Sequence, residues 1–556
     1  MAEPGKPSAI EDLKAASRFQ RGEIKADLEG PEPGFSSDSQ HLLKLHGLYQ
    51  QKHRDKAKQG APPPVLMLRG RIPGGRLSAE QYLAWDSLAD TFGDATLRVT
   101  TRQSLELHAV PKGDLKAVIQ AIARVKLTTQ GACGDVVRNV TQAVNPWGRP
   151  DLAQLDPVAE LLSAHFMAKS RAYVEIWLDG EPVDSGSESE PLLGATYLPR
   201  KFKISLTLAG ENAVDLLSND LGLAATLDEG GVIDGYFVFA GGGQGQALQD
   251  ATTFPRLADL LGWIPQAALI SVAEAVVTTF RDHGNRSERK RARLKYLIHN
   301  RGLDWFRGEV EARAGLAFVA RELPEWRTTP FLGWQSRVDG TWALGLHILS
   351  GRIDDTEDRQ IKQGLREVIT SFGPSVQLTS DQDLILLGIP AGDRPAVEAI
   401  LRSKGIQINL PNSLRKKALA CVALPYCSLA ITEGERALPG FLDELESLLE
   451  RHGLSDRAPV FRMTGCGNGC ARPYSAELAL VGQAIDKYAI FTGGHPEGLR
   501  LCESVAERVP KARIAPALDS LFALWKGEGE AGESFGDFTH RAGRDRVAAL
   551  LAQAIG

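Results

Sequence analysis

Four cysteines in the last quarter of the chain have a spacing that suits a shared metal centre. Cys421 and Cys427 are separated by five residues, and Cys466 and Cys470 by three. Four thiolates can bind a structural zinc ion or a [4Fe–4S] cluster. Zinc knuckles favour a two-residue gap, which neither pair has, and the loop at 464–470 (TGCGNGC) is rich in glycine, which permits close backbone approach to a bulky group. The pattern therefore favours an iron–sulfur cluster, with zinc and simple buried thiols as alternatives.

The composition excludes several classes of protein. The 556 residues are 43% hydrophobic and 24% charged with a formal net charge of −5, so the chain is globular and is not built to coat nucleic acid or an anionic membrane. No apolar run reaches the roughly 18 residues of a membrane helix, and the polar N-terminus lacks the features of a signal peptide. Six cysteines are too few for a disulfide scaffold, so we expect a cytoplasmic protein in which Cys133 and Cys502 pack as small hydrophobic residues.

Two basic stretches could bind an anion. In PRKFK, Lys201 and Lys203 are two residues apart, so on an extended strand they share one face. Residues 286–295 (RSERKRARLK) are the densest basic stretch and end a single helix that we predict over 266–300. By themselves such runs are usually solvated strand edges or helix faces. Beside a polyanion they would instead form strong carboxylate–cation pairs.

An internal repeat predicts a duplicated α/β unit. Residues 97–111 (LRVTTRQSLELHAVP) resemble residues 376–390 (VQLTSDQDLILLGIP), and each stretch follows a predicted helix and precedes another. We expect the two copies to be related by a pseudo-twofold axis. In the first copy, one strand over 95–110 would place its polar side chains on one face, namely Thr100, Arg102, Ser104, Glu106 and His108. Their counterparts include Asp381, Ile385 and Leu387, so we expect the first copy to line a polar site and its twin to line core.

Other segments have simpler interpretations. Periodicity and turn residues predict a strand over 65–71 and helices over 78–92, 115–125 and 395–403. Residues 1–35 are polar and rich in Gly and Pro, which is typical of an arm, and residues 183–192 are predicted to form a surface loop.

Several segments resemble, in the same order along the chain, the siroheme-dependent assimilatory sulfite and nitrite reductases. The most specific is TGCGNGCARPYSAELALVG at 464–482, and the others include HGLYQQKHRD, LRGRIPGG, GACGDVVRNV, YLPRKFK and SFGDFTHRAG. The chain is identified as a member of this family, and within it the sulfite reductase hemoprotein (beta) subunit is the most similar.

The resemblance implies a mixed α+β and α/β fold. Two ferredoxin-like halves with pseudo-twofold symmetry would be accompanied by two α/β domains that bind siroheme and a [4Fe–4S] cluster. The expected boundaries are 1–37 for the arm, 38–125 for the first half, 126–327 for the first siroheme-binding domain, 328–407 for the second half, and 408–556 for the second siroheme- and cluster-binding domain.

The resemblance also implies which residues bind the cofactors. Cys421, Cys427, Cys466 and Cys470 would bind the cluster, and Cys470 would also be the proximal ligand of the siroheme iron. Siroheme carries eight carboxylates, and the side chains implied to contact the cofactors are Thr100, Arg102, His108, Arg289, Arg293 and Asn468. Two positions depart from the family pattern.

The first departure is Glu106, which stands where close relatives have Gln. It would be repelled by the carboxylate-rich ring unless it is protonated or paired with a cation such as Arg102. The second is Arg293, which stands where some relatives have Lys and keeps the charge.

The substrate-facing cations implied by the family motifs are Arg69, Arg138, Lys201 and Lys203. Lys203 is also the basis for choosing sulfite over nitrite, because nitrite reductases typically have Asn at this position and sulfite carries more charge. The implied reaction is the six-electron reduction of sulfite to sulfide, with electrons supplied by a ferredoxin or by an NADPH-dependent flavoprotein subunit. The alternatives are a siroheme nitrite reductase that makes ammonia, a non-catalytic zinc-binding scaffold and a protein that only transfers electrons.

Overall fold

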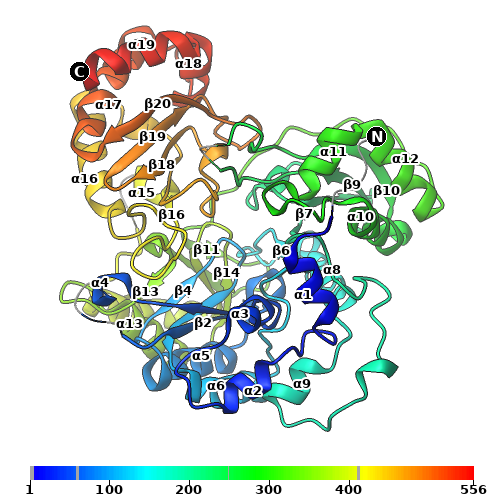
Figure 1. Cartoon of the computed structure of the whole chain (residues 1–556). Helices are drawn as coiled ribbons and strands as arrows, with labels where there is room; N and C mark the ends of the chain where they lie inside the picture. The colour runs from blue at the N-terminus through cyan, green and yellow to red at the C-terminus, as the bar shows by residue number, and fades with distance from the viewer. Residues whose placement is uncertain (1–5, 58–59, 61, 248–249, 410–412) are drawn as a thin grey trace. The chain divides into compact units, whose positions relative to one another are not determined.

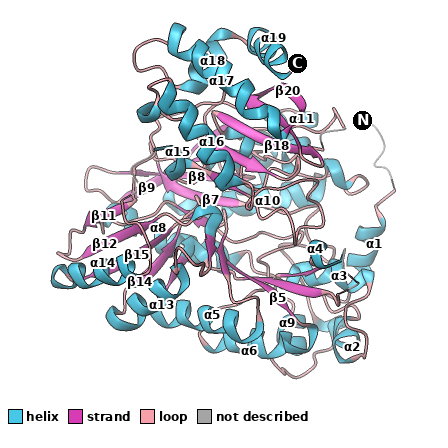
Figure 2. Ribbon diagram, turned by 90° about the vertical axis from the view of Figure 1, so that its left-hand side faces the viewer, coloured by secondary structure: helices cyan, strands magenta, loops and turns pink. Residues whose placement is uncertain are grey.

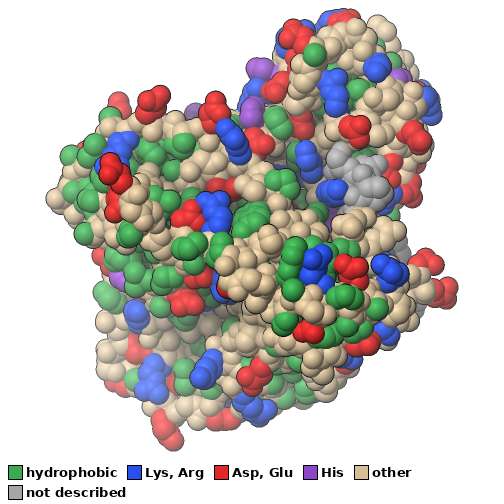
Figure 3. All heavy atoms as spheres, turned by 180° about the vertical axis from the view of Figure 1, so that it is seen from behind, with side chains coloured by type: hydrophobic (Ala, Val, Ile, Leu, Met, Phe, Trp, Pro, Cys, Tyr) green, Lys and Arg blue, Asp and Glu red, His purple; other side chains and the backbone are tan. Residues whose placement is uncertain are grey.

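The computed structural model describes residues 6–57, 60, 62–247, 250–409 and 413–556. The chain divides into two compact units (Figure 1). The first unit comprises residues 1–52, 61–242 and 258–408, and the second comprises residues 53–60, 243–257 and 409–556. No helix among the described residues is long and apolar enough to cross a membrane. Acidic and basic side chains are interspersed over the face drawn in Figure 3.

Within the described residues, the strands form four five-stranded sheets, and two of these sheets confirm the predicted duplication. The first has the order β1 (Leu48–Gln51), β2 (Val65–Arg69), β5 (Leu105–Val110), β4 (Leu97–Val99) and β13 (Arg352–Ile353). The second has the order β11 (Gly333–Ser336), β12 (Trp342–Leu346), β15 (Leu384–Ile389), β14 (Ser375–Leu378) and β3 (Arg76–Leu77). Each half therefore lends its short strand to the edge of the other half's sheet, an exchange that obeys twofold symmetry.

Equivalent helices accompany the two sheets, and they lie in one row beneath the strands in Figure 2. They are α5 (Ala79–Phe92) and α6 (Leu115–Arg124) in the first half and α13 (Ile361–Phe372) and α14 (Arg394–Ser403) in the second. Helix α5 begins with a capping box, in which Ser78 and Gln81 satisfy each other's backbone N–H groups. Asp86 of α5 is buried and pairs with Lys362 and Arg366 of α13, so charge as well as packing joins the halves.

The prediction of one strand over 95–110 was wrong, because the segment is a hairpin. The β4 strand ends at Val99, the Thr100 N–H donates to the Ser104 carbonyl at 2.9 Å, and β5 returns antiparallel to β4. Gln103 has a φ of +50° in this turn, and its twin Gln382 has a φ of +67°. Each of these two side-chain amides also donates across the twofold, Gln103 to the Leu378 carbonyl at 3.0 Å and Gln382 to the Val99 carbonyl at 3.5 Å. A turn therefore replaces the expected polar strand face between Thr100 and Ser104.

The third sheet, also in the first unit, has the order β10, β9, β8, β7, β6. Its strands are β6 (Thr141–Gln142), β7 (Ile204–Leu208), β8 (Leu221–Leu227), β9 (Ile233–Ala240) and β10 (Asp259–Pro265). The helices of this part are α7 (Pro150–Ala153), α8 (Leu155–His165), α9 (Ala172–Trp177), α10 (Leu269–His283), α11 (Leu294–Arg301) and α12 (Leu303–Ala314).

The predicted single helix over 266–300 is wrong. Helix α10 ends at His283, and Gly284 is extended, with φ −67° and ψ 149°. The side chain of Asn285 then accepts hydrogen bonds from the backbone N–H groups of Ser287 and Glu288, which stabilises a turn in place of another helical turn. The basic run therefore lies mostly in a loop that can direct its arginines inward.

The fourth sheet belongs to the second unit and repeats the pairing pattern of the third. Both have two parallel pairs followed by two antiparallel pairs. Its strands are β16 (Leu419–Ala420), β17 (Phe461–Thr464), β18 (Leu478–Ala484), β19 (Lys487–Thr492) and β20 (Glu503–Pro510). The helices are α4 (Arg54–Ala57), α15 (Ser413–Lys417), α16 (Leu438–Arg451), α17 (Lys511–Glu528), α18 (Phe535–Ala542) and α19 (Arg544–Ile555).

The N-terminal segment is more ordered than its composition predicts. Its described part contains α1 (Ala9–Ala16) and α2 (Ile24–Glu29), followed by α3 (Ser37–Leu43). Glu11 and Lys14 of α1 are 4% and 3% exposed, because they pack in an ion-paired arrangement on the first unit.

Candidate functional site

The four predicted cluster ligands come together in the second unit. Cys421 directly follows β16, and Cys466 and Cys470 lie in the loop between β17 and β18. The backbone N–H of Cys421 donates to Met463 of β17 at 3.2 Å, and the Gly465 N–H donates to the Cys421 sulfur at 3.4 Å. Parallel pairing of β16 with β17 thus brings two thiol-bearing strand ends to the same edge. None of these four cysteines forms a disulfide bond.

The four thiols act on one another electrostatically. Burial, followed by the charge of Cys470, raises the pKa of Cys466 to about 11. The same two causes raise the pKa of Cys427 and, more strongly, that of Cys421. A thiol that resists ionisation in this way becomes a thiolate ligand when a cationic centre supplies compensating charge. The donor set therefore fits a metal cluster held by four thiolates.

The loop around Cys466 has room only for glycine at key positions. A Cβ on Gly465 would lie 2.5 Å from the Thr432 carbonyl oxygen, and Gly469 has a φ of +65°. Hydrogen bonds from Asn468 oppose the rise in the pKa of Cys466, which places the predicted cofactor residue Asn468 against a predicted cluster ligand. The backbone of this glycine-rich loop can therefore approach a bulky group closely, as its glycine content predicts. Among the described residues, no group of three His, Cys, Asp or Glu side chains could hold a single metal ion.

Four predicted cations, Lys201, Lys203, Arg102 and Arg293, lie close enough in the first unit for their charges to interact. The backbone N–H of Lys203 and the guanidinium of Arg293 both donate to the Asp220 carboxylate, at 2.9 Å and 2.8 Å. Burial, and then the charges of Lys201, Arg102 and Arg293, lower the pKa of Lys203 well below its ordinary value, and Asp220 offsets this only in part. Such crowding of positive charge is costly unless a polyanion arrives. The cluster of cations therefore fits a cofactor rich in carboxylates.

Arg102 has a second role that sequence reasoning did not predict. Its guanidinium donates to the Asn219 side chain at 2.7 Å and to the backbone carbonyls of Asn139 and Ile204. The Thr100 hydroxyl accepts a hydrogen bond from the Arg102 N–H at 3.2 Å. Thr100 and Arg102 therefore also hold the β4–β5 turn against the third sheet.

Glu106 is ionised and paired. Its carboxylate accepts from Arg69 at 2.9 Å and lies 3.4 Å from Arg98 and 3.5 Å from His108. Burial alone would raise the pKa of Glu106, but Arg69, His108 and Arg98 together hold it well below its ordinary value. Of the two expected alternatives, protonation or pairing with a cation, the structure shows pairing, and the cations in contact include Arg69 and Arg98. Arg69 also donates to the sulfur of Cys133 at 3.2 Å.

Arg138 and Arg289 lie in the wall of a cavity of about 240 Å³ in the first unit. The Arg138 guanidinium donates to the Gly134 carbonyl at 3.2 Å, and Arg289 forms a bidentate pair with Asp135 at 2.9 and 3.2 Å. Sequence reasoning missed further charged residues here. Arg200 could have been found as the neighbour of Lys201 in PRKFK, whereas Lys14 and Lys44 carried no signal of their own.

Cys133 and Cys502 are 0% and 4% exposed, which confirms their prediction as buried residues. The other sequence-predicted side chains thus fall into three groups. The second unit holds the four thiols and Asn468, and the first unit holds the Lys203 group and a group around Arg69 and Arg138. Arg138 is joined to the Lys203 group through its N–H, which donates to the Phe202 carbonyl at 2.9 Å.

Comparison with known proteins agrees with the duplicated halves and the predicted site described above. A family profile described as a nitrite/sulfite reductase ferredoxin-like half domain matches residues 58–125 and 335–404, the two halves of the duplication. A profile described as a nitrite and sulphite reductase 4Fe-4S domain matches residues 158–318. That segment contains no cysteine, and the four-thiol set lies outside it, in the second unit.

Full-length relatives extend the likeness. The chain is 43% identical to "Sulfite reductase [ferredoxin]" of Synechococcus elongatus, over 98% of this chain and 91% of the relative. It is also 43% identical to "Sulfite reductase [NADPH] hemoprotein beta-component" of Shewanella putrefaciens, over 96% of both chains. The structure of Mycobacterium tuberculosis NirA protein has the same fold, with a TM-score of 0.80 at 23% identity over 98% of each chain. The chain therefore belongs to the family of siroheme-dependent nitrite and sulfite reductases.

Proposed function

We propose that this protein reduces sulfite to sulfide in a six-electron reaction, with siroheme and a [4Fe–4S] cluster as its cofactors. One observation carries the proposal. A four-thiol set in the second unit coexists with a cluster of buried and half-buried cations around Lys203 in the first. A zinc scaffold or a simple electron carrier needs no such cations. The 43% identity to two proteins named sulfite reductases, over nearly the full chain, supports sulfite as the substrate.

When bound, the two cofactors supply the route for electrons and the centre at which sulfite is reduced. The four cysteines would hold the cluster, and Arg102, Arg293 and their neighbours would bind the siroheme carboxylates. The contribution of Arg69, Arg138, Lys201 and Lys203 is to hold the substrate oxygens in a fixed positive field, and the two lysines also supply protons as those oxygens leave as water. Preorganised charge of this kind is commonly the largest part of a protein's contribution to catalysis.

Lys203 is suited to proton donation. An ammonium group whose pKa is lowered by burial and by neighbouring cations is a stronger acid than an exposed lysine. The Asp220 carboxylate accepts a hydrogen bond from the backbone N–H of Lys203, which fixes the segment that carries the Lys203 side chain. Arg69 and Arg138 offer rigid guanidinium groups, which bind oxyanions but do not release protons near neutral pH.

Substituting Lys203 by Asn tests the substrate preference. We expect Lys203→Asn to lower kcat/KM for sulfite about tenfold more than kcat/KM for nitrite, because the dianion loses a charge-assisted hydrogen bond. Lys417→Asn, at an exposed lysine of α15, is the control and should leave both values unchanged. Equal losses with the two substrates would refute the role of Lys203 in specificity and would favour a nitrite reductase.

A visible spectrum tests the cofactors independently of turnover. The anaerobically purified protein should be coloured by siroheme and the cluster, and its bands should shift when sulfite is added to the reduced protein. A colourless protein with stoichiometric zinc would refute both the cofactors and the reaction, and only the assignment of the fold would stand.

The electron donor is a separate part of the proposal. Relatives named as ferredoxin-dependent and as NADPH-dependent are equally similar to this chain. We propose a ferredoxin, since the segments ELPEW, GACGD and CARPY resemble the ferredoxin-dependent branch. Turnover with reduced ferredoxin, compared with turnover with NADPH and a flavoprotein subunit, decides between them. A cytoplasmic location, where thiols stay reduced, completes the proposal.

A further inference from the structure

Three exposed hydrophobic side chains lie on one surface region of the second unit. Among the described residues, seven large hydrophobic side chains are exposed, and three of these are Leu429, Ile431 and Ile485, at 64%, 40% and 81%. The Asp486 N–H donates to the Thr432 hydroxyl at 3.2 Å, which brings the turn between β18 and β19 beside the loop that carries Leu429 and Ile431. We call this region the apolar patch. Single exposed hydrophobic residues are ordinary, whereas a group of them marks a surface that another molecule covers.

The apolar patch is joined directly to the predicted cluster ligands. The Ile431 N–H donates to the Gly465 carbonyl at 2.8 Å, and the Gly465 N–H donates to the Cys421 sulfur at 3.4 Å. Burial raises the pKa of Cys427, and a backbone hydrogen bond from Leu429 opposes this rise. A protein seated on the patch would therefore contact backbone groups that are hydrogen-bonded, directly or through one further residue, to two of the four thiols.

Exposed cations border the apolar patch. Lys487 is the first residue of β19. The Arg508 N–H donates to a side chain of β18 at 2.6 Å, and the Lys511 N–H donates to the Asp486 carbonyl at 2.9 Å. None of these three cations forms an ion pair with another residue that the structure describes. The exposed carboxylates of the same two segments are Asp486 and Glu507, so this border is net positive in a chain whose formal net charge is −5.

We propose that the apolar patch is the docking surface of the electron donor, and that its partner is a small acidic iron–sulfur protein of the ferredoxin kind. This inference rests on the proposed function, which requires a protein donor. An apolar centre with a charged rim is typical of a transient interface, and complementary charge speeds the encounter of the two proteins. A weak electron-transfer complex also needs only a small contact area. A second copy of the chain fits less well, because a twofold interface would bring the same unpaired cations together.

Binding of an oxidised, acidic [2Fe–2S] ferredoxin to the cofactor-loaded protein tests the surface without turnover. Ile485→Ser should raise the Kd about tenfold, the effect of withdrawing one aliphatic side chain from an interface. Its siroheme and cluster absorption should match those of the wild type, because Ile485 is almost fully exposed. Val338→Ser is the matched control, since Val338 is 68% exposed but belongs to the first unit, and its Kd should be that of the wild type.

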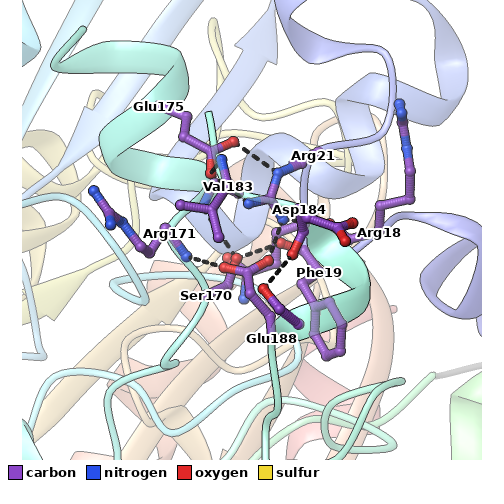
Figure 4. A network of polar contacts seen from close by, with 12 residues as sticks. Arg18, Phe19, Arg21, Ser170, Arg171, Glu175, Val183, Asp184 and Glu188 are labelled. Carbon is purple, nitrogen blue, oxygen red and sulfur yellow. Dashed lines mark hydrogen bonds and ion pairs between the residues drawn. The ribbon is translucent and has the colours of Figure 1, made fainter. Parts of the chain in front are cut away.

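Lys487→Glu tests the charged border. The Kd should rise about tenfold at low ionic strength, and the difference should shrink at high salt, because salt screens exposed charges. Arg18→Glu is the control, since it changes the net charge of the chain by the same amount in the first unit. The Arg18 side chain is 58% exposed and lies beside the network in Figure 4, in which Arg21 pairs with Glu175 and Glu188, so the substitution leaves those pairs in place.

An unchanged Kd in both Ile485→Ser and Lys487→Glu would overturn the docking surface, as would equal changes in the two controls. Binding of a flavoprotein subunit or of a second copy that depends on Ile485, with no binding of ferredoxin, would overturn the choice of partner.

Reduced methyl viologen, a small donor that needs no docking surface, separates this inference from the proposed function. We expect Ile485→Ser and Lys487→Glu to reduce sulfite at the wild-type rate with methyl viologen and more slowly with ferredoxin. If the wild type reduces sulfite with methyl viologen while both variants bind ferredoxin normally, the docking surface is wrong and the proposed function stands. If ferredoxin binding depends on the patch but sulfite is not reduced with either donor, the proposed function fails and the docking surface stands.

Discussion

The Arg69–Glu106 pair allows a prediction in which stability and substrate binding change in opposite directions. Glu106 is 3% exposed, accepts from Arg69 at 2.9 Å and lies 3.4 Å from Arg98. In Glu106→Gln, the amide oxygen can still accept one hydrogen bond from Arg69, but the negative charge is lost. Hydrogen bonds to charged groups contribute about 1.5–3 kcal/mol and neutral ones about 0.5–1.5 kcal/mol. With two cations affected, we expect the free energy of unfolding to fall by about 1–3 kcal/mol.

The pH dependence gives the sign of the effect. Because the folded-state pKa of Glu106 lies well below its ordinary value of 4.5, its stabilisation is fully present above pH 4.5 and is lost as the pH falls below it. Urea unfolding of the wild type and of Glu106→Gln should therefore differ at neutral pH and converge in acid. Glu23→Gln is the control, since Glu23 belongs to an exposed pair with Arg18 and should change stability by less than about 0.5 kcal/mol.

Catalysis supplies the second readout. Glu106 neutralises Arg69, so its removal should leave Arg69 with more positive charge for sulfite and should lower KM. A variant with wild-type stability at neutral pH would refute the paired, ionised state of Glu106. Loss of stability with an unchanged KM would show that Arg69 supports the fold and does not face the substrate.

Three further predictions concern separate parts of the molecule. Glu190 is buried, and burial raises its pKa from 4.5 to about 7, so its ionisation destabilises the fold progressively as the pH rises between these values. Glu190→Gln should be more stable than the wild type at pH 8, by at most about 3 kcal/mol, and equal to it near pH 4 when both are unfolded in urea. Equal stability at both pH values would show that Glu190 is solvated in the folded protein. Gly75→Ala should lower the Tm by several degrees, because Gly75 has a φ of +71° and a Cβ there would press on the Leu378 carbonyl; an unchanged Tm would contradict the strand exchange at this turn. Cys466→Ser should abolish the absorption and iron content of the cluster while the far-UV circular dichroism is retained, and an intact cluster would remove Cys466 from the ligand set.

Local patterns were sufficient for much of the fold. The repeat at 97–111 and 376–390 predicted two equivalent α/β halves, because each copy carries its own helix, strand and turn residues. The exchange of β3 and β13 was not predictable in the same way, since two-residue strands have no periodicity and each pairs with a strand of the other half. The hairpin at 100–104 was missed because polar residues alternate through it as they would in a strand, whereas the positive φ of Gln103 creates a turn.

For the site, local patterns predicted the four thiols, and the resemblance to a family predicted the main cations. Spacing and glycine content marked Cys421, Cys427, Cys466 and Cys470, because ligand types and loop shape are local properties. Which cations lie side by side, and which carboxylates pair with them, became known only from the three-dimensional contacts. Lys14 meets Asp135, and Arg69 meets Glu106, through contacts that join distant segments. Their charges therefore acquire a functional meaning only when folding removes the water that would otherwise screen them.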